Sequence, residues 1–264
     1  MELIRKILQT LPDGETLDVR VGLRWTAVVL DPGGGVRCGL SSTLDPAHDH
    51  AAGPNVPGAG ALTQLSGRQL ADLALSDRPL EVAIGMAAIN ALLPPLPEKY
   101  REDNAEEMIA RLGAGKKVAL IGHFPFVESL RGRVGGLAVL ELNPRQGDLP
   151  AAQGPQVIPQ AQVVAITAMT LLNRTLEGIL ELCAPEAAVL MLGPTTPLSP
   201  LLFGAGIDVL SGSVVTQVDA VLRVVSQGGN FRQVHRAGVR LVNLLRQDFE
   251  VSAPPANPKR GDSK

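Results

Sequence analysis

The spacing of apolar residues changes twice over the first hundred positions. Apolar side chains recur every three or four positions over 3–11, which predicts an amphipathic helix. Over 17–23 they alternate with polar ones, and two further apolar runs flank the glycine-rich turn at 31–35, so we expect an antiparallel meander of three strands. Helical spacing returns after Ser66 and again over 81–93. This first part is therefore expected to be a small α+β domain.

Short aliphatic runs alternate with helix-compatible stretches in the rest of the chain. The runs expected to form strands are 118–121, 137–142, 163–166, 188–192 and 207–210, with 239–245 as a last strand. The alternation predicts an α/β fold in which a Rossmann-like, mostly parallel sheet is preceded by the smaller α+β domain. The predicted domains are 1–100 and 101–250, and we expect the polar, proline-rich tail over 251–264 to be disordered.

Polar groups follow every predicted strand of the parallel sheet. In chain order they lie in the turns 122–125, 141–144, 167–170, 193–197 and 211–213. An open parallel sheet binds its ligands beyond the carboxyl ends of its strands. We therefore expect these turns to converge on one crevice.

His123 and Glu141 are the candidates for catalytic work. A histidine exchanges a proton near neutral pH, so His123 is a candidate general acid–base or metal ligand, with capping of the next helix as the alternative. Glu141 stands nineteen positions after Gly122, where a dinucleotide fold holds an acid on the ribose hydroxyls. Phe124 and Pro125 occupy positions where a pyrophosphate needs glycine. A diphosphate ligand is therefore disfavoured, whereas a ribose-like diol stays open.

Other polar residues allow both a functional and a structural interpretation. Thr170 and Asn173 surround a predicted helix start, where free N–H groups attract anions, yet helix capping also explains them. Asn90 lies late in its helix, where a local hydrogen bond is commoner than a ligand contact. His48 and His50 are spaced to hold a metal ion from an extended loop, although a structural zinc site needs four ligands and a solvated loop is favoured.

Composition narrows the range of partners. The 24 basic and 26 acidic residues give a net charge of -2, and no basic run is interleaved with aromatic residues, so nucleic acid is not expected. Cys38 and Cys183 form neither a CxxC pair nor a disulfide framework, which indicates a reducing compartment. The start of the chain is charged, and no apolar run is long enough for a bilayer. We expect a cytoplasmic protein with no membrane partner, and a homodimer on base rates.

Short motifs in a fixed order resemble one known family. They are GHFPF at 122–126, ELNP at 141–144, TLLNRTLE at 170–177, GPTTPLSP at 193–200 and LSGSVV at 210–215. Together with pieces further upstream, they are similar to the putative heavy-metal chelation family, long catalogued as a domain of unknown function. The resemblance implies an enolase N-terminal-like domain, a Rossmann-like domain with partial likeness to methyltransferases, and a ligand site at their junction.

The same resemblance carries site residues over position by position. The ligand contacts that it implies are Asn90, His123, Glu141, Asn143, Thr170, Asn173, Gly193, Pro194 and Thr195. Gly122 and Phe124 join them because they flank His123 in the first turn. The chain departs from the family pattern at Gln162, where aspartate is common, and at Ala168, where glycine is common. Both departures count against tightly packed or acid-dependent chemistry at the third turn.

Three hypotheses for function follow. In the first, the protein binds a pterin-, flavin- or siderophore-like metal chelator in an interdomain cleft and catalyses its condensation or hydrolysis, with His123 moving protons and Glu141 and Asn143 orienting the ligand. In the second, it is a non-catalytic metal-binding protein or metallochaperone using His48, His50 and His123. In the third, it is a methyltransferase-like enzyme that binds S-adenosylmethionine with Glu141 on the ribose. The cofactor stays unknown at this point, with a divalent metal ion as the candidate and S-adenosylmethionine as the cofactor of the third hypothesis.

Overall fold

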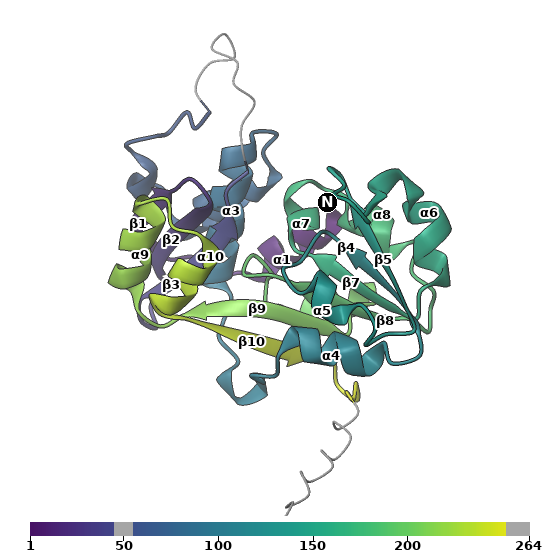
Figure 1. The fold of residues 1–264 in the computed structure, drawn as a ribbon. Coiled ribbons are helices and arrows are strands. Elements are labelled where there is room, and N and C mark those ends of the chain that lie inside the picture. The colour runs from purple at the N-terminus through teal and green to yellow at the C-terminus, as the bar shows by residue number, and fades with distance from the viewer. Residues whose placement is uncertain (45–54, 252–264) are drawn as a thin grey trace, which may run out of the picture.

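The computed structural model describes residues 1–44 and 55–251. The histidine pair His48 and His50 and the tail from residue 252 onward lie outside the described residues. The described part holds a three-stranded antiparallel sheet from the first half of the chain and a seven-stranded sheet from the second half (Figure 1). The predicted α/β fold with a mostly parallel sheet is confirmed.

The first half builds the small sheet and the helices that cover one of its faces. Its helices and strands are α1 (Glu2–Thr10), β1 (Glu15–Val21), β2 (Trp25–Asp31), β3 (Arg37–Ser42), α2 (Gly67–Asp72) and α3 (Pro79–Leu92). The strands pair in the order β1-β2-β3, both pairs antiparallel, as the alternating pattern predicted. Ser66 begins α2 with a capping box in which its hydroxyl accepts a hydrogen bond from the Gln69 N–H.

The helix α3 is buried along almost its whole circumference, because it lies between the small sheet and α7 of the second half. It approaches β3 closely at Gly39. A Cβ atom there would lie 2.0 Å from the Ala87 carbonyl oxygen and 2.4 Å from the Ala91 nitrogen. The helix and the strand therefore touch through backbone, which only glycine permits.

The second half builds the large sheet. Its helices and strands are α4 (Ala105–Leu112), β4 (Lys117–Ile121), α5 (Val127–Leu130), β5 (Gly136–Glu141), β6 (Leu149–Pro150), α6 (Gly154–Val157), β7 (Val163–Thr167), α7 (Met169–Leu172), α8 (Leu176–Leu180), β8 (Ala188–Leu192), β9 (Val209–Val215), α9 (Val218–Ser226), α10 (Phe231–Arg236) and β10 (Val239–Leu245). Among the described residues, no helix is both long and apolar enough to cross a bilayer.

The strands of the large sheet lie in the order β10-β9-β8-β7-β4-β5-β6, all parallel except β10. Alternate residues face opposite sides: Val118 and Leu120 pack with α4 and α5, whereas Ala119 and Ile121 join the larger core cluster on the other face. From β4 the chain proceeds to β5 and β6 on one side and then returns to β7 on the other. The carboxyl ends of β4 and β7 therefore form the switch point where open sheets bind ligands.

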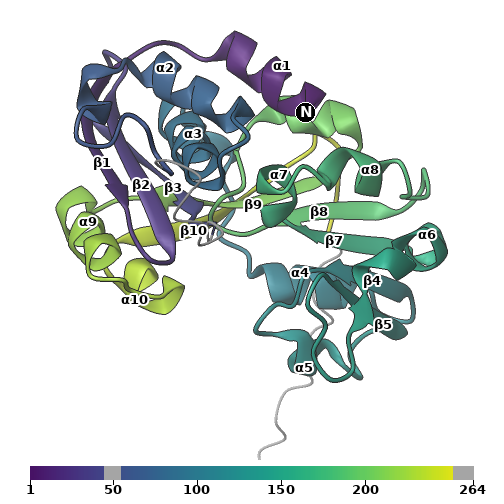
Figure 2. The same cartoon turned by 90° about the horizontal axis from the view of Figure 1, so that it is seen from above.

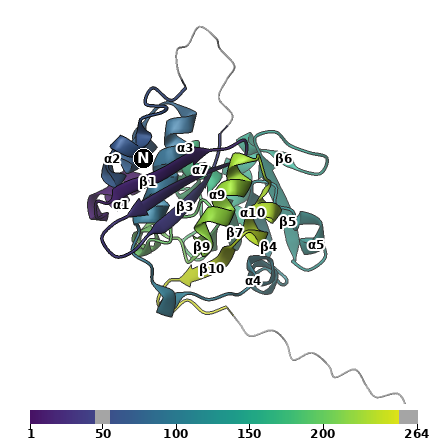
Figure 3. The ribbon, with the colours of Figure 1, turned by 90° about the vertical axis from the view of Figure 1, so that its left-hand side faces the viewer.

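The two halves pack against each other at the β9–β10 edge of the large sheet. The helices α9 and α10 leave the large sheet and cover the second face of the small one (Figure 2). Val221 and Val225 of α9 pack there with Ala27 and Val29 of β2. Figure 3 shows α9 and α10 next to the small sheet, with the left-hand side of Figure 1 facing the viewer.

One predicted turn is wrong. Residues 211–213 were expected to follow the fifth strand, but they lie inside β9, which continues to Val215 because β10 pairs with it antiparallel. The Ser211 hydroxyl is buried and bonds the side-chain oxygen of Asn243 on β10, at 2.5 Å. The Ser213 hydroxyl donates to the Pro194 carbonyl at 3.0 Å, so both serine hydroxyls bond groups away from the carboxyl ends of β4 and β7.

Candidate functional site

A cavity of about 530 Å³ lies at the carboxyl ends of β4, β5 and β7, and we call it the strand-end cavity. Most of its wall is apolar and comes from the segments around α6 and α8, with Leu44 contributed by the first half. Its polar edge is formed by the turns that follow the strands. The volume falls within the range of small-molecule sites, and the position is the one that the strand order predicts.

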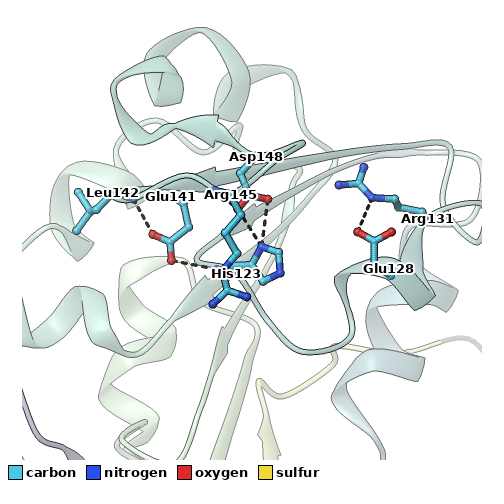
Figure 4. A network of polar contacts seen from close by, with 7 residues as sticks. All are labelled: His123, Glu128, Arg131, Glu141, Leu142, Arg145 and Asp148. Carbon is cyan, nitrogen blue, oxygen red and sulfur yellow. Dashed lines mark hydrogen bonds and ion pairs between the residues drawn. The ribbon is translucent and has the colours of Figure 1, made fainter.

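His123 stands on the polar edge and is held by a buried carboxylate (Figure 4). Its Nδ1 lies 2.9 Å from Asp148 Oδ2 and 3.1 Å from Oδ1. The Asp148 side chain is fully buried, whereas 17% of the His123 side chain is exposed. The Arg145 N–H also donates to Asp148, at 3.1 Å.

Burial acts to raise the pKa of Asp148, but hydrogen bonds from the Arg145 N–H and from His123, with the charges nearby, outweigh it and lower that pKa below its ordinary value. The ionised carboxylate can only accept, so Nδ1 of His123 carries the hydrogen. Nε2 then holds a lone pair in the neutral ring, and no described residue bonds to it. This arrangement leaves Nε2 able to take up a proton or to bind a metal ion.

Glu141 ends β5 directly beside His123. Its Oε1 accepts the His123 N–H at 3.3 Å, and its Oε2 accepts the Leu142 N–H at 2.6 Å. Each oxygen keeps a second lone pair, so the carboxylate is fixed in position and still able to accept from a ligand. In a dinucleotide fold the acid at the end of the second strand has the same place.

The other turn residues of the polar edge serve the local backbone as well. Gly122, Phe124, Asn143, Thr170 and Asn173 all line the strand-end cavity. Gly122 has φ +104°, and a Cβ there would lie 2.9 Å from a methyl group of Thr167. Thr170 Oγ1 donates to the Thr167 carbonyl at 2.7 Å, and Asn173 Oδ1 accepts from the Thr175 hydroxyl at 2.7 Å. Local hydrogen bonds thus use part of the hydrogen-bonding capacity of Thr170 and Asn173, and neither side chain caps α7 or α8.

Four predicted site residues lie elsewhere. Asn90, Gly193, Pro194 and Thr195 do not line the strand-end cavity. Instead the loop after β8 contacts the first half, in a region that we call the domain joint. Asn90 Nδ2 donates to the Leu40 carbonyl at 2.8 Å and to the Thr195 carbonyl at 3.0 Å, and Thr195 Oγ1 accepts the Ser42 N–H at 2.9 Å. These side chains connect the two halves.

Asp148 is the residue that the sequence interpretation missed. It follows Glu141 by seven positions, at the end of the turn NPRQGD that leads from β5 to β6. An acid in a turn rich in proline and glycine was a usable signal, because such turns bring polar side chains back to the strand end. The apolar wall residues Ile158, Ile179 and Leu182 were also missed, since nothing in their spacing separates a cavity wall from a core.

The described residues do not form a metal centre of their own. No group of three or more histidine, cysteine or acidic side chains within 1–44 and 55–251 is placed to hold one ion. His123 and Glu141 supply at most two donors from the strand-end cavity, fewer than a protein zinc site uses. A metal ion at this place would need further donors from a bound small molecule.

Comparison with known proteins identifies the family. A family model described as putative heavy-metal chelation, DUF364, matches residues 104–243, which is more than half of the chain. The chain belongs to this family. A second model with the same description, DUF4213, matches residues 4–93. The resemblance inferred from the motifs is therefore confirmed.

Solved structures from the DUF364 family share the fold over almost the whole chain. A protein with unknown function from Desulfitobacterium hafniense has a TM-score of 0.76 and 27% identity, covering 93% of this chain and 98% of that chain. One from Pyrococcus horikoshii has a TM-score of 0.77 and 22% identity, covering 92% and 98%. An uncharacterized protein of Methanocaldococcus jannaschii is 29% identical over 150 residues, 54% of this chain and 58% of that protein. The chain thus spans little more than half the length of this curated relative.

Proposed function

We propose that the protein binds a small, ring-containing polar molecule of the metal-chelating kind, pterin-, flavin- or siderophore-like, in the strand-end cavity. The observation that carries this proposal is the pair of His123 and the buried Asp148 at the edge of a largely apolar cavity. A heteroaromatic ring fits apolar walls, and its polar edge needs fixed hydrogen-bonding groups. Glu141 accepts N–H or O–H groups of the ligand, and Asn143 orients it.

The charge of the cavity favours some chelators over others. No lysine or arginine is among the residues that line it in the described part of the chain, and Glu141 is acidic. A phosphate or a multiply charged carboxylate would meet a carboxylate with no lysine or arginine among the described residues of the cavity wall to offset it. The proposed ligand is therefore neutral or cationic at the edge that faces Glu141.

His123 gives the site its chemistry. In a condensation or hydrolysis of the bound molecule, Nε2 of His123 takes the proton from the attacking N–H or O–H group and returns it to the leaving group. Asp148 holds the ring in the required tautomer and stabilises the imidazolium that forms. A metal ion carried by the ligand is cargo in this scheme, and Nε2 of His123 does not bind it during the proton transfer.

A thermal-shift and calorimetry screen tests the proposal. The probes are pterin, riboflavin and a catecholate chelator, each with and without Fe³⁺. Wild-type protein should bind at least one of them, and His123→Ala should lower its affinity about tenfold or more. His235→Ala is the matched control, because that histidine is exposed on α10 and stacks on Phe231. Equal binding by wild type and His123→Ala would remove His123 from the site.

A second candidate ligand is a nucleoside-containing cofactor such as S-adenosylmethionine. The position of Glu141 at the end of β5, beside the first turn, favours it, because a ribose diol can donate to that carboxylate. Calorimetry with S-adenosylmethionine decides between the two ligand classes: binding that Glu141→Gln abolishes would support the nucleoside, and the absence of heat would dismiss it.

A further inference from the structure

Two helical segments form much of the apolar wall of the strand-end cavity, and both present the same spacing of residues to it. One segment contains α6 and the other contains α8. Their lining residues are Ala151, Gly154, Pro155 and Ile158 in the first, and Thr175, Gly178, Ile179 and Leu182 in the second. In each segment these positions are spaced i, i+3, i+4 and i+7, which defines one face of a helix. Both segments therefore turn a helix face toward the cavity.

Each of these two faces carries a glycine at its second position, and the backbone requires neither. Gly154 has φ −47° and ψ −48°, and Gly178 lies inside α8, so both have ordinary helical conformations. Alanine would also fit. A Cβ at Gly178 would have no atom within 4 Å, and a Cβ at Gly154 would lie 3.4 Å from Ile158 Cδ1, an ordinary contact distance. These positions keep open space although alanine would make a helix more stable.

The two glycines border one slot between the helical segments. A Cβ at Gly154 would lie 4.0 Å from Leu182 Cδ1, so this position faces the second segment one turn beyond Gly178. Gly154 is buried and Gly178 is exposed, which places Gly154 at the closed end of the slot and Gly178 nearer to its mouth. Because neither position has a side chain, backbone borders the slot there. Such a space fits a thin ring better than a branched molecule.

We infer that the ligand of the strand-end cavity is a planar fused ring, pterin- or flavin-like, which lies between the two helix faces, and that Gly154 and Gly178 limit its thickness. This inference rests on the proposed function, and it narrows the metal-chelating class to its flat members. The ring enters the apolar slot, and its polar edge meets His123 and Glu141. A branched siderophore-like chelator does not fit between the glycines.

Calorimetry with a matched pair of uncharged probes, 2-naphthol and decahydro-2-naphthol, tests the shape of the slot. Both probes have two fused rings and one hydroxyl, but only 2-naphthol is planar. A cavity that selects for apolar surface alone would bind the saturated probe at least as tightly. The slot should instead bind 2-naphthol at least about tenfold more tightly than decahydro-2-naphthol.

Alanine variants of the two glycines test which residues limit the thickness. Gly154→Ala and Gly178→Ala should each lower the affinity for 2-naphthol about tenfold, because one added methyl group narrows the slot. The melting temperatures of the free variants should be unchanged or raised, which separates lost space from a damaged fold. Gly204→Ala is the matched control. A Cβ at Gly204 also has no atom within 4 Å, but Gly204 does not line the cavity, so this variant should bind as wild type does.

Three results would overturn the inference. They are no binding of 2-naphthol by wild-type protein up to about 1 mM, wild-type affinity in both Gly154→Ala and Gly178→Ala, and equal or tighter binding of the saturated probe. The proposed function is tested separately, by the effect of His123→Ala on pterin, riboflavin and the catecholate chelator. If that screen failed, preference for 2-naphthol that both glycine variants weaken would still establish the slot.

Discussion

The strand-end cavity and the domain joint differ in how tightly their surroundings are packed. The walls of the strand-end cavity include exposed turns, and Gly178 of α8 lies on it with open space around its Cα. At the domain joint the backbones of β3 and α3 touch at Gly39, and Asn90 and Thr195 connect the two halves by hydrogen bonds. Substitutions around the strand-end cavity should therefore be tolerated better than substitutions at the domain joint, which holds the two halves of the molecule together.

The largest expected difference between the two regions is the change in the free energy of unfolding when Gly39 or Gly178 is replaced by alanine. Gly39→Ala forces a Cβ to 2.0 Å from a backbone oxygen of α3, so we expect it to lower the free energy of unfolding by about 3 kcal/mol or more. Gly178→Ala adds a Cβ with no atom within 4 Å inside a helix and should raise that free energy by about 0.5 kcal/mol. Urea unfolding of both variants measures the difference. Similar stabilities would contradict the packing described at Gly39.

Asp148→Asn should have the next largest effect, and one that depends on pH. The native-state pKa of Asp148 lies below its ordinary value of 3.8, so its ionised form stabilises the fold. That contribution is fully present above pH 3.8 and is lost as the pH falls through the lowered pKa of the folded state. Near neutral pH the variant should be less stable by about 1–2 kcal/mol, because a hydrogen bond to a charged group is lost. Urea midpoints from about pH 3 to 7 test this: the deficit should shrink on the acid side.

A matched control confines this pH dependence to the His123–Asp148 pair. Glu128 is exposed and pairs with Arg131 on the surface, so Glu128→Gln should change the midpoint by less than about 0.5 kcal/mol at any pH. A deficit for Asp148→Asn that stayed constant down to pH 3 would contradict the lowered pKa of its carboxyl group.

The polar edge of the strand-end cavity was predictable because it depends on topology. Once apolar runs define parallel strands, right-handed crossovers place their carboxyl ends together, so His123, Glu141 and Thr170 had to meet. Asp148 was not predictable in the same way. Its position depends on the course of an aperiodic turn, which apolar spacing does not specify.

The residues of the domain joint show a second limit of what the sequence can predict. Resemblance to the family indicated that Asn90 and Thr195 matter, but not which space they face. Their placement follows from the packing of α3 against the loop after β8, a contact between segments about a hundred residues apart. The strand β9 was misjudged for a related reason, since its antiparallel partner β10 comes from the end of the chain.

The smallest expected difference is between the alkylation rates of the two cysteines, one in each half of the chain. Burial, with a smaller contribution from the charge of Asp18, raises the pKa of Cys38 to about 12, and burial raises that of Cys183 to about 11. Below both values the fraction of reactive thiolate falls tenfold per unit, so Cys38 should react with iodoacetamide about tenfold more slowly than Cys183 at pH 8. Mass spectrometry after timed labelling gives both rates, and urea-unfolded protein, in which the two rates should converge, is the control. Cys38 of β3 lines a cavity at the domain joint, so faster labelling of Cys38 than of Cys183 would mean that the joint opens in solution.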